Sequence, residues 1–259
     1  MRIVVKNLAC RRSGRLVFDN LSFTLSGGDA LVVTGRNGAG KSSLLTLLAG
    51  RLRPDAGAID VEGAGERTLA ESLHLVAHRD GLKSALTAEE NLAFARDLLG
   101  DPALSPREAL DAVRLAHAAP LPVAYLSAGQ RRRVALARLL VAHRPLWLLD
   151  EPTAALDAAS QETLLHLMTA HLAGGGLIVA ATHAPLDIGG AKELRLDRDV
   201  PSPSRGGAGA GGANPERDAA KRDAPDMESS KAGPAFSSTG SPGGTPPTPL
   251  REGEGRGAP

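Results

Sequence analysis

One run of eight residues has the types and spacing of a phosphate-binding loop. The run is Gly35, Arg36, Asn37, Gly38, Ala39, Gly40, Lys41 and Ser42. Glycines in such a loop let backbone N–H groups turn toward phosphate oxygens, and the N-terminus of the following helix adds the positive end of its dipole. In this chemistry Lys41 bridges the β- and γ-phosphates and the Ser42 hydroxyl binds Mg²⁺. We therefore expect the loop, together with Ser43 after it, to bind a nucleoside triphosphate.

Two adjacent carboxylates follow a second apolar run, residues 146–149. Asp150 and Glu151 come about 110 residues after the phosphate-binding loop. We expect Asp150 to join the Mg²⁺ shell, directly or through water, and Glu151 to polarise the water that attacks the γ-phosphate. Acidic residues also commonly end strands, so the pair takes this meaning from the loop that precedes it.

The segment 126–130 has two interpretations. It reads Leu126, Ser127, Ala128, Gly129 and Gln130. A small, glycine-containing loop before a helix exposes backbone N–H groups and a hydroxyl, which suits an anion. The alternative is an ordinary helix N-cap, in which the serine accepts a hydrogen bond from the first turn. The segment by itself leaves both interpretations open.

The elements that must position these residues alternate between strands and helices. The predicted strands are residues 3–8, 21–25, 30–33, 57–62, 73–77, 146–149, 177–181 and 193–196. Helices are predicted directly after the phosphate-binding loop and at 158–172. This alternation indicates an α/β domain with a largely parallel sheet, which we place at residues 1–199.

Three consecutive predicted helices interrupt the alternation. Capping-box sequences open two of them, at Thr87 and at Ser105. The third should cover residues 129–142. We expect the three to form a helical subdomain at about 84–142, inserted into the α/β domain.

Composition separates residues 200–259 from the rest and limits the possible functions. That segment is almost wholly Gly, Pro, Ala, Ser, Thr and scattered charges, so it cannot offset its ordering entropy by burial and is predicted to be disordered. The net charge of +1 gives no case for nucleic-acid binding. The single cysteine, Cys10, fits a reducing compartment. No apolar stretch approaches the roughly 20 residues that span a bilayer, so we expect a cytoplasmic chain that reaches a membrane only through a partner.

Taken together, the motifs resemble those of the ATP-binding-cassette (ABC) ATPases in order and spacing across residues 2–198. The segment 126–130 resembles the signature sequence of that family, with Ala128 in place of its first glycine. Asp157 matches the family's D-loop, and His183 matches its switch histidine. The resemblance implies a P-loop cassette with N-terminal antiparallel strands and an inserted helical subdomain.

The resemblance also implies that the active form is a head-to-tail dimer of two copies. Each ATP, with its Mg²⁺, would lie between the phosphate-binding loop of one copy and the signature loop of the other. The implied residues are 35–43, Asp150, Glu151 and His183 from one copy, and Ser127, Gly129 and Gln130 from the second. The γ-phosphate then completes the interface, so ATP binding closes the dimer and hydrolysis loosens it.

Two positions depart from the general ABC pattern. The family normally has a glutamine after the strand at 73–77, where this chain has His78, and imidazole can still hydrogen-bond a water. The family normally stacks an aromatic residue on the adenine, and that place falls near Arg12, whose guanidinium can also stack on a base. We therefore include both residues in the predicted nucleotide site.

The segments 78–92, 125–138 and 145–157 resemble one branch of the family, the ATP-binding subunits of bacterial cytochrome c maturation complexes. The match includes His78 and Ala128. It implies an integral membrane permease as partner and a peripheral location at the cytoplasmic face of the inner membrane. It also implies a role in haem export or in ATP-driven release of a haem-loaded chaperone.

Other functions stay open on the sequence alone. The ATPase of a different exporter would share the motifs. A non-transport ABC protein acting on DNA or ribosomes usually has two cassettes or long coiled-coil insertions, and a nucleotide sensor without turnover would not need Glu151 and His183. The scattered histidines and the run 131–133 could suggest haem ligation or nucleic-acid binding, but packing and charge pairing are the favoured interpretations.

Overall fold

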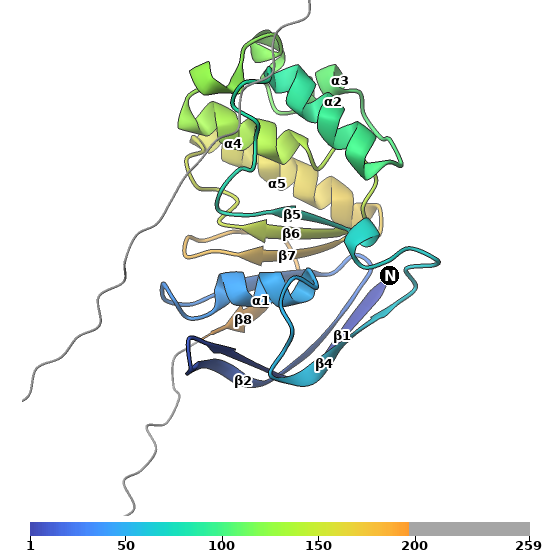
Figure 1. The fold of residues 1–259 in the computed structure, drawn as a ribbon, viewed down its shortest axis with the longest axis vertical. Helices are drawn as coiled ribbons and strands as arrows, with labels where there is room; N and C mark the ends of the chain where they lie inside the picture. The colour runs from blue at the N-terminus through green and yellow to red at the C-terminus, as the bar shows by residue number, and fades with distance from the viewer. Residues whose placement is uncertain (197–259) are drawn as a thin grey trace, which may run out of the picture. The chain divides into compact units, whose positions relative to one another are not determined.

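Five parallel strands form the centre of the fold in the computed structural model, which describes residues 1–196 (Figure 1). Their order across the sheet is β5 (Leu73–Val76), β6 (Leu146–Asp150), β7 (Leu177–Ala181), β3 (Ala30–Thr34) and β8 (Lys192–Arg195). Every neighbouring pair in this order is parallel. The predicted α/β class with a parallel sheet is confirmed, whereas the predicted extension at 200–259 lies outside the described residues.

Both faces of this sheet are buried, because alternate residues of each strand enter different cores. The helices that cover it and surround it are α1 (Lys41–Leu48), α2 (Ala88–Leu99), α3 (Pro106–Ala112), α4 (Ala128–Ala137) and α5 (Ala158–Ala173). Leu146 and Leu148 of β6 pack into a core with α1 and the N-terminal strands. Trp147 and Leu149 of the same strand pack into a core with α4 and α5. The alternation follows from the two-residue period of a strand, and it places α1 and α4 on opposite faces of the sheet (Figure 1).

A second, antiparallel sheet is formed by the N-terminal part of the chain. Its order is β2 (Arg15–Ser26), β1 (Arg2–Arg12) and β4 (Ala56–Glu62). The predicted strands 3–8 and 21–25 are too short, because β1 and β2 continue to a tight hairpin. Ser13 and Gly14 at its turn have φ values of 49° and 76°, the conformation that matches the twist of paired strands.

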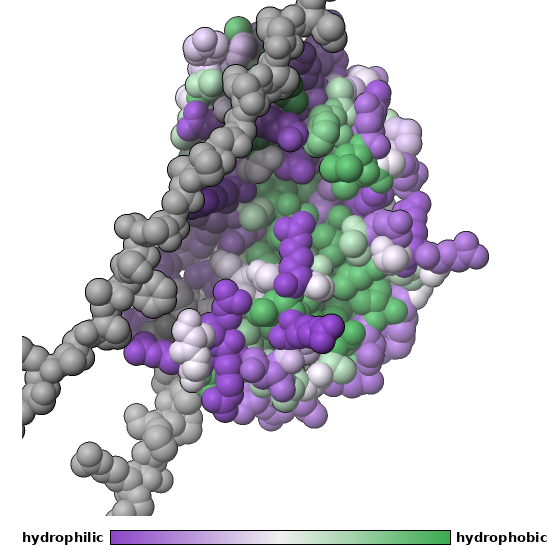
Figure 2. All heavy atoms as spheres, viewed as in Figure 1, coloured by the Kyte–Doolittle hydropathy of each residue, from purple (hydrophilic) through white to green (hydrophobic). Residues whose placement is uncertain are grey.

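The helical region, residues 84–142, has a hydrophobic core of its own. Leu92 of α2, Leu110 of α3 and Val134 of α4 are fully buried in it. Figure 2 shows apolar surface across the middle of the face seen in Figure 1, with polar side chains around it. The insertion of a packed helical unit between β5 and β6 agrees with the prediction.

Both predicted capping boxes are present. The Thr87 hydroxyl accepts from Glu90 N and the Ser105 hydroxyl accepts from Glu108 N. In return, each glutamate carboxylate accepts from the backbone N–H of its cap residue. The third predicted helix is too long, since α4 ends at Ala137 rather than at residue 142. Beyond that point the carbonyls of residues 140 and 141 accept from the segment between α2 and α3, so they cannot continue a helix.

Two histidines are packing residues of the fold. His74 of β5 is 6% exposed, and its Nε2 donates to the Ala142 carbonyl at 3.0 Å. Burial lowers the pKa of His74 to about 4. His171 of α5 stacks on Trp147 with ring centroids 3.9 Å apart. No helix within residues 1–196 is long and apolar enough to cross a membrane.

Candidate active site

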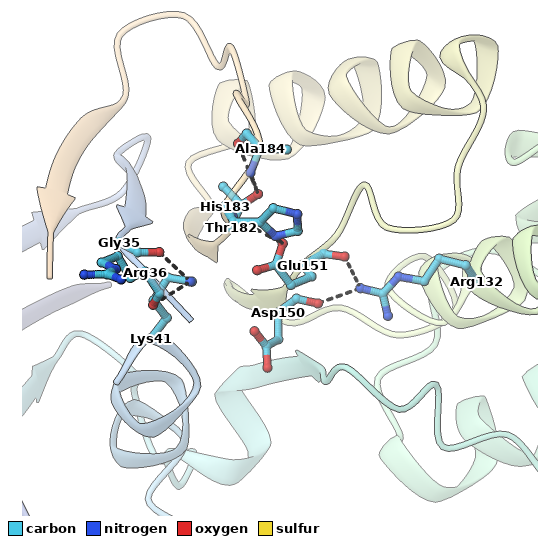
Figure 3. A network of polar contacts seen from close by, with 9 residues as sticks. All are labelled: Gly35, Arg36, Lys41, Arg132, Asp150, Glu151, Thr182, His183 and Ala184. Carbon is cyan, nitrogen blue, oxygen red and sulfur yellow. Dashed lines mark hydrogen bonds and ion pairs between the residues drawn. The ribbon is translucent and has the colours of Figure 1, made fainter. Parts of the chain in front are cut away.

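Several of the predicted site residues lie at one edge of the central sheet. Because β5, β6, β7 and β3 are neighbours and run parallel, their carboxyl ends lie along the same edge. His78 comes after β5, Asp150 and Glu151 stand at the end of β6, and His183 follows β7. The phosphate-binding loop follows β3. Residues that are far apart in the sequence are thus brought together by strand order alone (Figure 3).

The phosphate-binding loop turns sharply into α1. Gly40, the N-cap of that helix, has φ 106°, which a residue with a side chain rarely adopts. A Cβ at Gly40 would lie 2.3 Å from Val17 Cγ1, so the loop packs closely on the β1–β2 hairpin. The Ser42 side chain is exposed at the first turn of α1, which leaves its hydroxyl accessible.

Lys41 is held inside the loop by backbone carbonyls. Its side chain is only 7% exposed, and its Nζ donates to the Gly35 carbonyl at 2.8 Å and to the Arg36 carbonyl at 3.5 Å. A buried ammonium needs such partners, since an unpaired charge is costly to bury. The two bonds aim the ammonium across the concave side of the loop (Figure 3). A phosphate bound there would meet a cation that is already desolvated and positioned.

Asp150 and Glu151 end β6 with different surroundings. Asp150 is 7% exposed, and among residues 1–196 its carboxylate has no hydrogen-bond partner. Glu151 has φ 47°, a left-handed conformation that costs on the order of 1 kcal/mol for a residue with a side chain. Its N–H donates to the Ala181 carbonyl at 2.8 Å, which ties the strained residue to the end of β7. The strain turns its side chain away from the direction of the strand and toward His183.

His183 binds the Glu151 carboxylate through two donors. Its Nδ1 lies 2.8 Å from Glu151 Oε2 and its backbone N lies 3.3 Å from the same oxygen. A carboxylate oxygen only accepts, so Nδ1 carries the proton in this contact. Reciprocal bonds between Thr182 Oγ1 and the Ala184 backbone, at 3.1 and 3.0 Å, hold the turn that carries the histidine.

The signature loop lies at the start of α4, on the other face of the sheet from α1. Ser127 Oγ accepts from Gln130 N at 3.2 Å, and Gln130 Oε1 accepts from Ser127 N at 2.8 Å. The serine is therefore an N-cap, although its own O–H can still donate to an outside acceptor. Gly129 is required by close approach, because a Cβ there would lie 2.8 Å from the Ala155 carbonyl oxygen.

His78 and Arg12, the two residues that depart from the family pattern, are both exposed. His78 lies in the loop after β5, and Arg12 ends β1 in register with Arg15 at the tip of the hairpin. The same hairpin contacts Gly40 of the phosphate-binding loop through Val17 and Phe18. Contact of either residue with a nucleotide stays a prediction. Asp157, the predicted D-loop residue, caps α5, and hydrogen bonds from Ser160 lower its pKa.

Sequence reasoning missed the role of Arg132. The sequence favours charge pairing for the run 131–133, yet Arg132 is 4% exposed and donates to the backbone carbonyls of Asp150 and Glu151. Arg131 donates to the Leu126 carbonyl within the signature loop. The spacing gives no signal, because each of residues 131–133 lies four positions before a buried residue of α4.

These features define a P-loop ATPase of the ATP-binding-cassette class, and comparisons with known proteins agree. Residues 18–154 match the ABC transporter family. The cytochrome c biogenesis ATP-binding export protein CcmA of Rhodopseudomonas palustris (strain BisB5) is 57% identical over 192 residues, which cover 74% of this chain and 96% of that protein. The protein of the same name from Nitrobacter winogradskyi is 55% identical, with 76% and 98% covered.

The fold agrees with that of solved cassettes. A dimeric ATP-binding cassette in a post-hydrolysis state, bound to ADP and phosphate, superposes with a TM-score of 0.62 at 24% identity, over 70% of this chain and 88% of that one. The chain belongs to the ABC transporter family, and within it to the CcmA-type ATP-binding subunits.

Proposed function

We propose that this chain is the ATP-hydrolysing subunit of an ABC complex for cytochrome c biogenesis, with ATP bound between two copies arranged head to tail. The observation that carries the proposal is the contact of His183 with Glu151 at the sheet edge that also presents Lys41 and Asp150. The two relatives named above are called cytochrome c biogenesis ATP-binding export proteins, which supports this role.

The residues present fit a nucleoside triphosphate with Mg²⁺. Asp150 offers a carboxylate that has no hydrogen-bond partner within residues 1–196, and Ser42 offers an exposed hydroxyl; Mg²⁺ prefers such oxygen ligands. No group of three or more acidic, histidine or cysteine side chains forms a cage within residues 1–196, which suits a metal that takes its other ligands from phosphates and water. When bound, the ion would neutralise charge on the β- and γ-phosphates. Lys41 would give up its carbonyl partners for phosphate oxygens.

Glu151 is positioned to accept a proton from an attacking water. Its Oε2 already accepts from the backbone and the ring of His183, so Oε1 is the oxygen left for the water. The two bonds also fix the rotation of the carboxylate, which orients that second oxygen. His183 keeps Nε2 for the nucleotide side, and only its protonated form can donate to Glu151 and to a phosphate oxygen at the same time.

The second half of each site would come from another copy of the chain. The signature loop begins α4, whereas the phosphate-binding loop leads into α1 on the opposite face of the sheet. Ser127 and Gly129, with Gln130 behind them, offer a hydroxyl and N–H groups at a helix N-terminus, which suits the γ-phosphate of a neighbour's ATP. The solved cassette of the same fold is itself a dimer with ADP and phosphate.

A membrane subunit is the proposed partner for the helical region. Phe94 and Leu98 of α2 are 47% and 71% exposed, and they form an apolar pair one turn apart on the helix. Such a contact would place the chain at the cytoplasmic face of the inner membrane without a membrane span of its own. In this arrangement the ATPase cycle would serve haem export or release of a haem-loaded chaperone.

Replacement of Glu151 by glutamine tests the catalytic assignment. Glu151→Gln should lower kcat for ATP by about 100-fold or more, because a general base contributes that much, while ATP affinity and ATP-dependent dimerisation persist. Glu162→Gln, on the exposed side of α5, is the matched control and should keep wild-type turnover. Unchanged turnover in the Glu151 variant would refute the assignment.

Purification from membranes tests the physiological assignment. The chain should copurify with integral subunits of a cytochrome c biogenesis complex, and its deletion should abolish c-type cytochromes. Normal c-type cytochromes in a deletion strain would contradict this role and favour another exporter.

A further inference from the structure

The guanidinium of Arg132 joins three parts of the cassette. Its Nη1 donates to the Ala77 carbonyl at 2.9 Å and to Asp80 Oδ1 at 3.0 Å. Its Nη2 donates to the Asp150 carbonyl at 2.6 Å and to the Glu151 carbonyl at 2.8 Å (Figure 3). One side chain of α4 thereby holds both the loop that carries His78 and the end of β6.

Burial of the Arg132 guanidinium has a desolvation cost that a role in stability alone does not explain. The side chain is only 4% exposed, and its Nε has no hydrogen-bond partner in residues 1–196. Asp80, whose side chain is 23% exposed, is the carboxylate that pairs with it. A buried ion pair is weak evidence for stabilisation, since desolvation of both charges offsets their attraction. The geometry of the four acceptors is therefore the better clue to its role.

The acceptors lie where the backbone most needs support. Glu151 has φ 47°, and its N–H is held by the Ala181 carbonyl from the β7 side. From the α4 side, Arg132 donates to the Asp150 carbonyl before the Glu151 N–H and to the Glu151 carbonyl after it. The direction of the Glu151 carboxylate toward His183 follows from this backbone conformation. A shift of α4 would move the donor and with it the support of the strained residue.

We propose that Arg132 is a positioning residue for hydrolysis: it acts through the backbone of Asp150 and Glu151 and makes the orientation of Glu151 depend on the position of α4. This inference rests on the proposed function of the site and adds the link between the signature loop and the general base. Since the signature loop is the first turn of α4, engagement of that loop by a second copy's nucleotide is transmitted to Glu151 of its own chain.

Two neighbours on α4 provide a comparison within the same helix. Arg133 donates to the carbonyls of Val113 and Arg114, inside the helical region, and within residues 1–196 it makes no hydrogen bond to β6. Arg133→Lys is thus the matched control for Arg132→Lys. Lysine keeps the charge in both variants, but a single ammonium cannot reproduce the planar fork that spans Ala77, Asp150 and Glu151.

The first test separates positioning from binding. Arg132→Lys should lower kcat by at least tenfold while the Kd for ATP stays within about twofold of wild type, and Arg133→Lys should change neither. Asp80→Asn removes the carboxylate and keeps the three carbonyl bonds, so its loss of kcat should be smaller than that of Arg132→Lys. Full turnover in Arg132→Lys, or an equal loss of ATP affinity, would overturn the proposal. Should Arg132→Lys fail to fold, Arg132→Gln and Asp80→Asn carry the same comparison.

A double-mutant cycle tests whether the two residues act together. If Arg132 acts through Glu151, then adding Arg132→Lys to Glu151→Gln should leave the residual single-turnover rate within about twofold. Independent effects that multiply would refute the link. Failure of the proposed function is distinguishable, because it would appear as a Glu151→Gln variant with wild-type turnover, whatever Arg132 does.

Discussion

The phosphate-binding loop and the signature loop lie on opposite faces of one sheet and are built in different ways. The first runs from a strand in the middle of the sheet into α1, which packs directly on the sheet, and its lysine is already held in place by carbonyls of the same loop. The second begins α4, shares the separate core of the helical region, and exposes its serine. One half of the site is complete within a chain, and the other half faces outward.

We expect this difference to separate nucleotide binding from hydrolysis. Nucleotide affinity should depend on the phosphate-binding loop of a single chain, whereas turnover should also require the signature loop of a second copy. Arg132 reaches from α4 to the backbone carbonyls of Asp150 and Glu151 at the end of β6, so it links the helix of the signature loop to the residues beside the phosphate-binding loop. Variants on each face should therefore separate binding from hydrolysis.

The largest effect is expected at Lys41. Lys41→Ala should weaken ATP binding by roughly 100- to 1000-fold, since it removes a charge-assisted bond to phosphate at a buried position. The measurement is titration of the monomeric chain with a fluorescent nucleotide. Lys192→Ala, at an exposed ion pair with Asp29, serves as control. Wild-type affinity in Lys41→Ala would contradict the assignment of this loop.

Ser127 offers a sharper test, because its cap role and its proposed ligand role can be separated. Aspartate and asparagine cap helices as well as serine does, so neither Ser127→Asp nor Ser127→Asn should lower the melting temperature by more than a few degrees. Only aspartate places a negative charge against the γ-phosphate, so Ser127→Asp should lower turnover by roughly 100-fold and Ser127→Asn far less. Equal turnover in the two variants would leave Ser127 as an N-cap only.

Acid should weaken the contact between the sheet and the end of the helical region. The pKa of His74 is lowered to about 4 by burial, so this histidine binds its proton more readily in the unfolded chain than in the folded one. Stability is then complete above about pH 6.5 and falls by up to about 1.4 kcal/mol for each pH unit as the pH drops toward 4. His171, whose pKa burial also lowers, adds to the slope.

Chemical unfolding at several pH values measures that slope. His74→Gln keeps a donor for the Ala142 carbonyl and removes the titrating group, so its stability should depend less on pH in this window. An identical slope in the variant and the wild type would show that other groups set the acid sensitivity.

The smallest effect is expected for a helix cap far from the chemistry. Ser105→Ala removes the hydroxyl that accepts from Glu108 N and should lower the free energy of unfolding by about 1 kcal/mol. ATP affinity and kcat should stay at wild-type values, because α3 lies in the core of the helical region. A large loss of turnover would indicate that this region is more tightly coupled to the site than its separate core implies.

The strands that carry the site were within reach of the sequence, but the side-chain connections between them were not. Apolar runs at 146–149 and 177–181 fix strands whose ends carry Asp150 and His183, and parallel strands must end at one edge. The predicted lengths of the two hairpin strands and the predicted end of α4 were wrong. The first depends on the turn at Ser13, and the second depends on hydrogen bonds from a segment distant in the sequence to carbonyls that follow α4. The contacts of Arg132 were missed for the same reason: a charged triplet on a helix gives no sign of which member is buried.

The central claim is that each active site is shared by two copies, and a mixing experiment tests it most directly. Lys41→Ala and Ser127→Asp should each be nearly inactive alone. In a mixed dimer one site combines both defects, while the other combines an intact Lys41 with an intact Ser127. An equal mixture should therefore recover about a quarter of wild-type ATP turnover, if dimers form at random and sites act independently. A mixture as inactive as its two components would contradict the shared site.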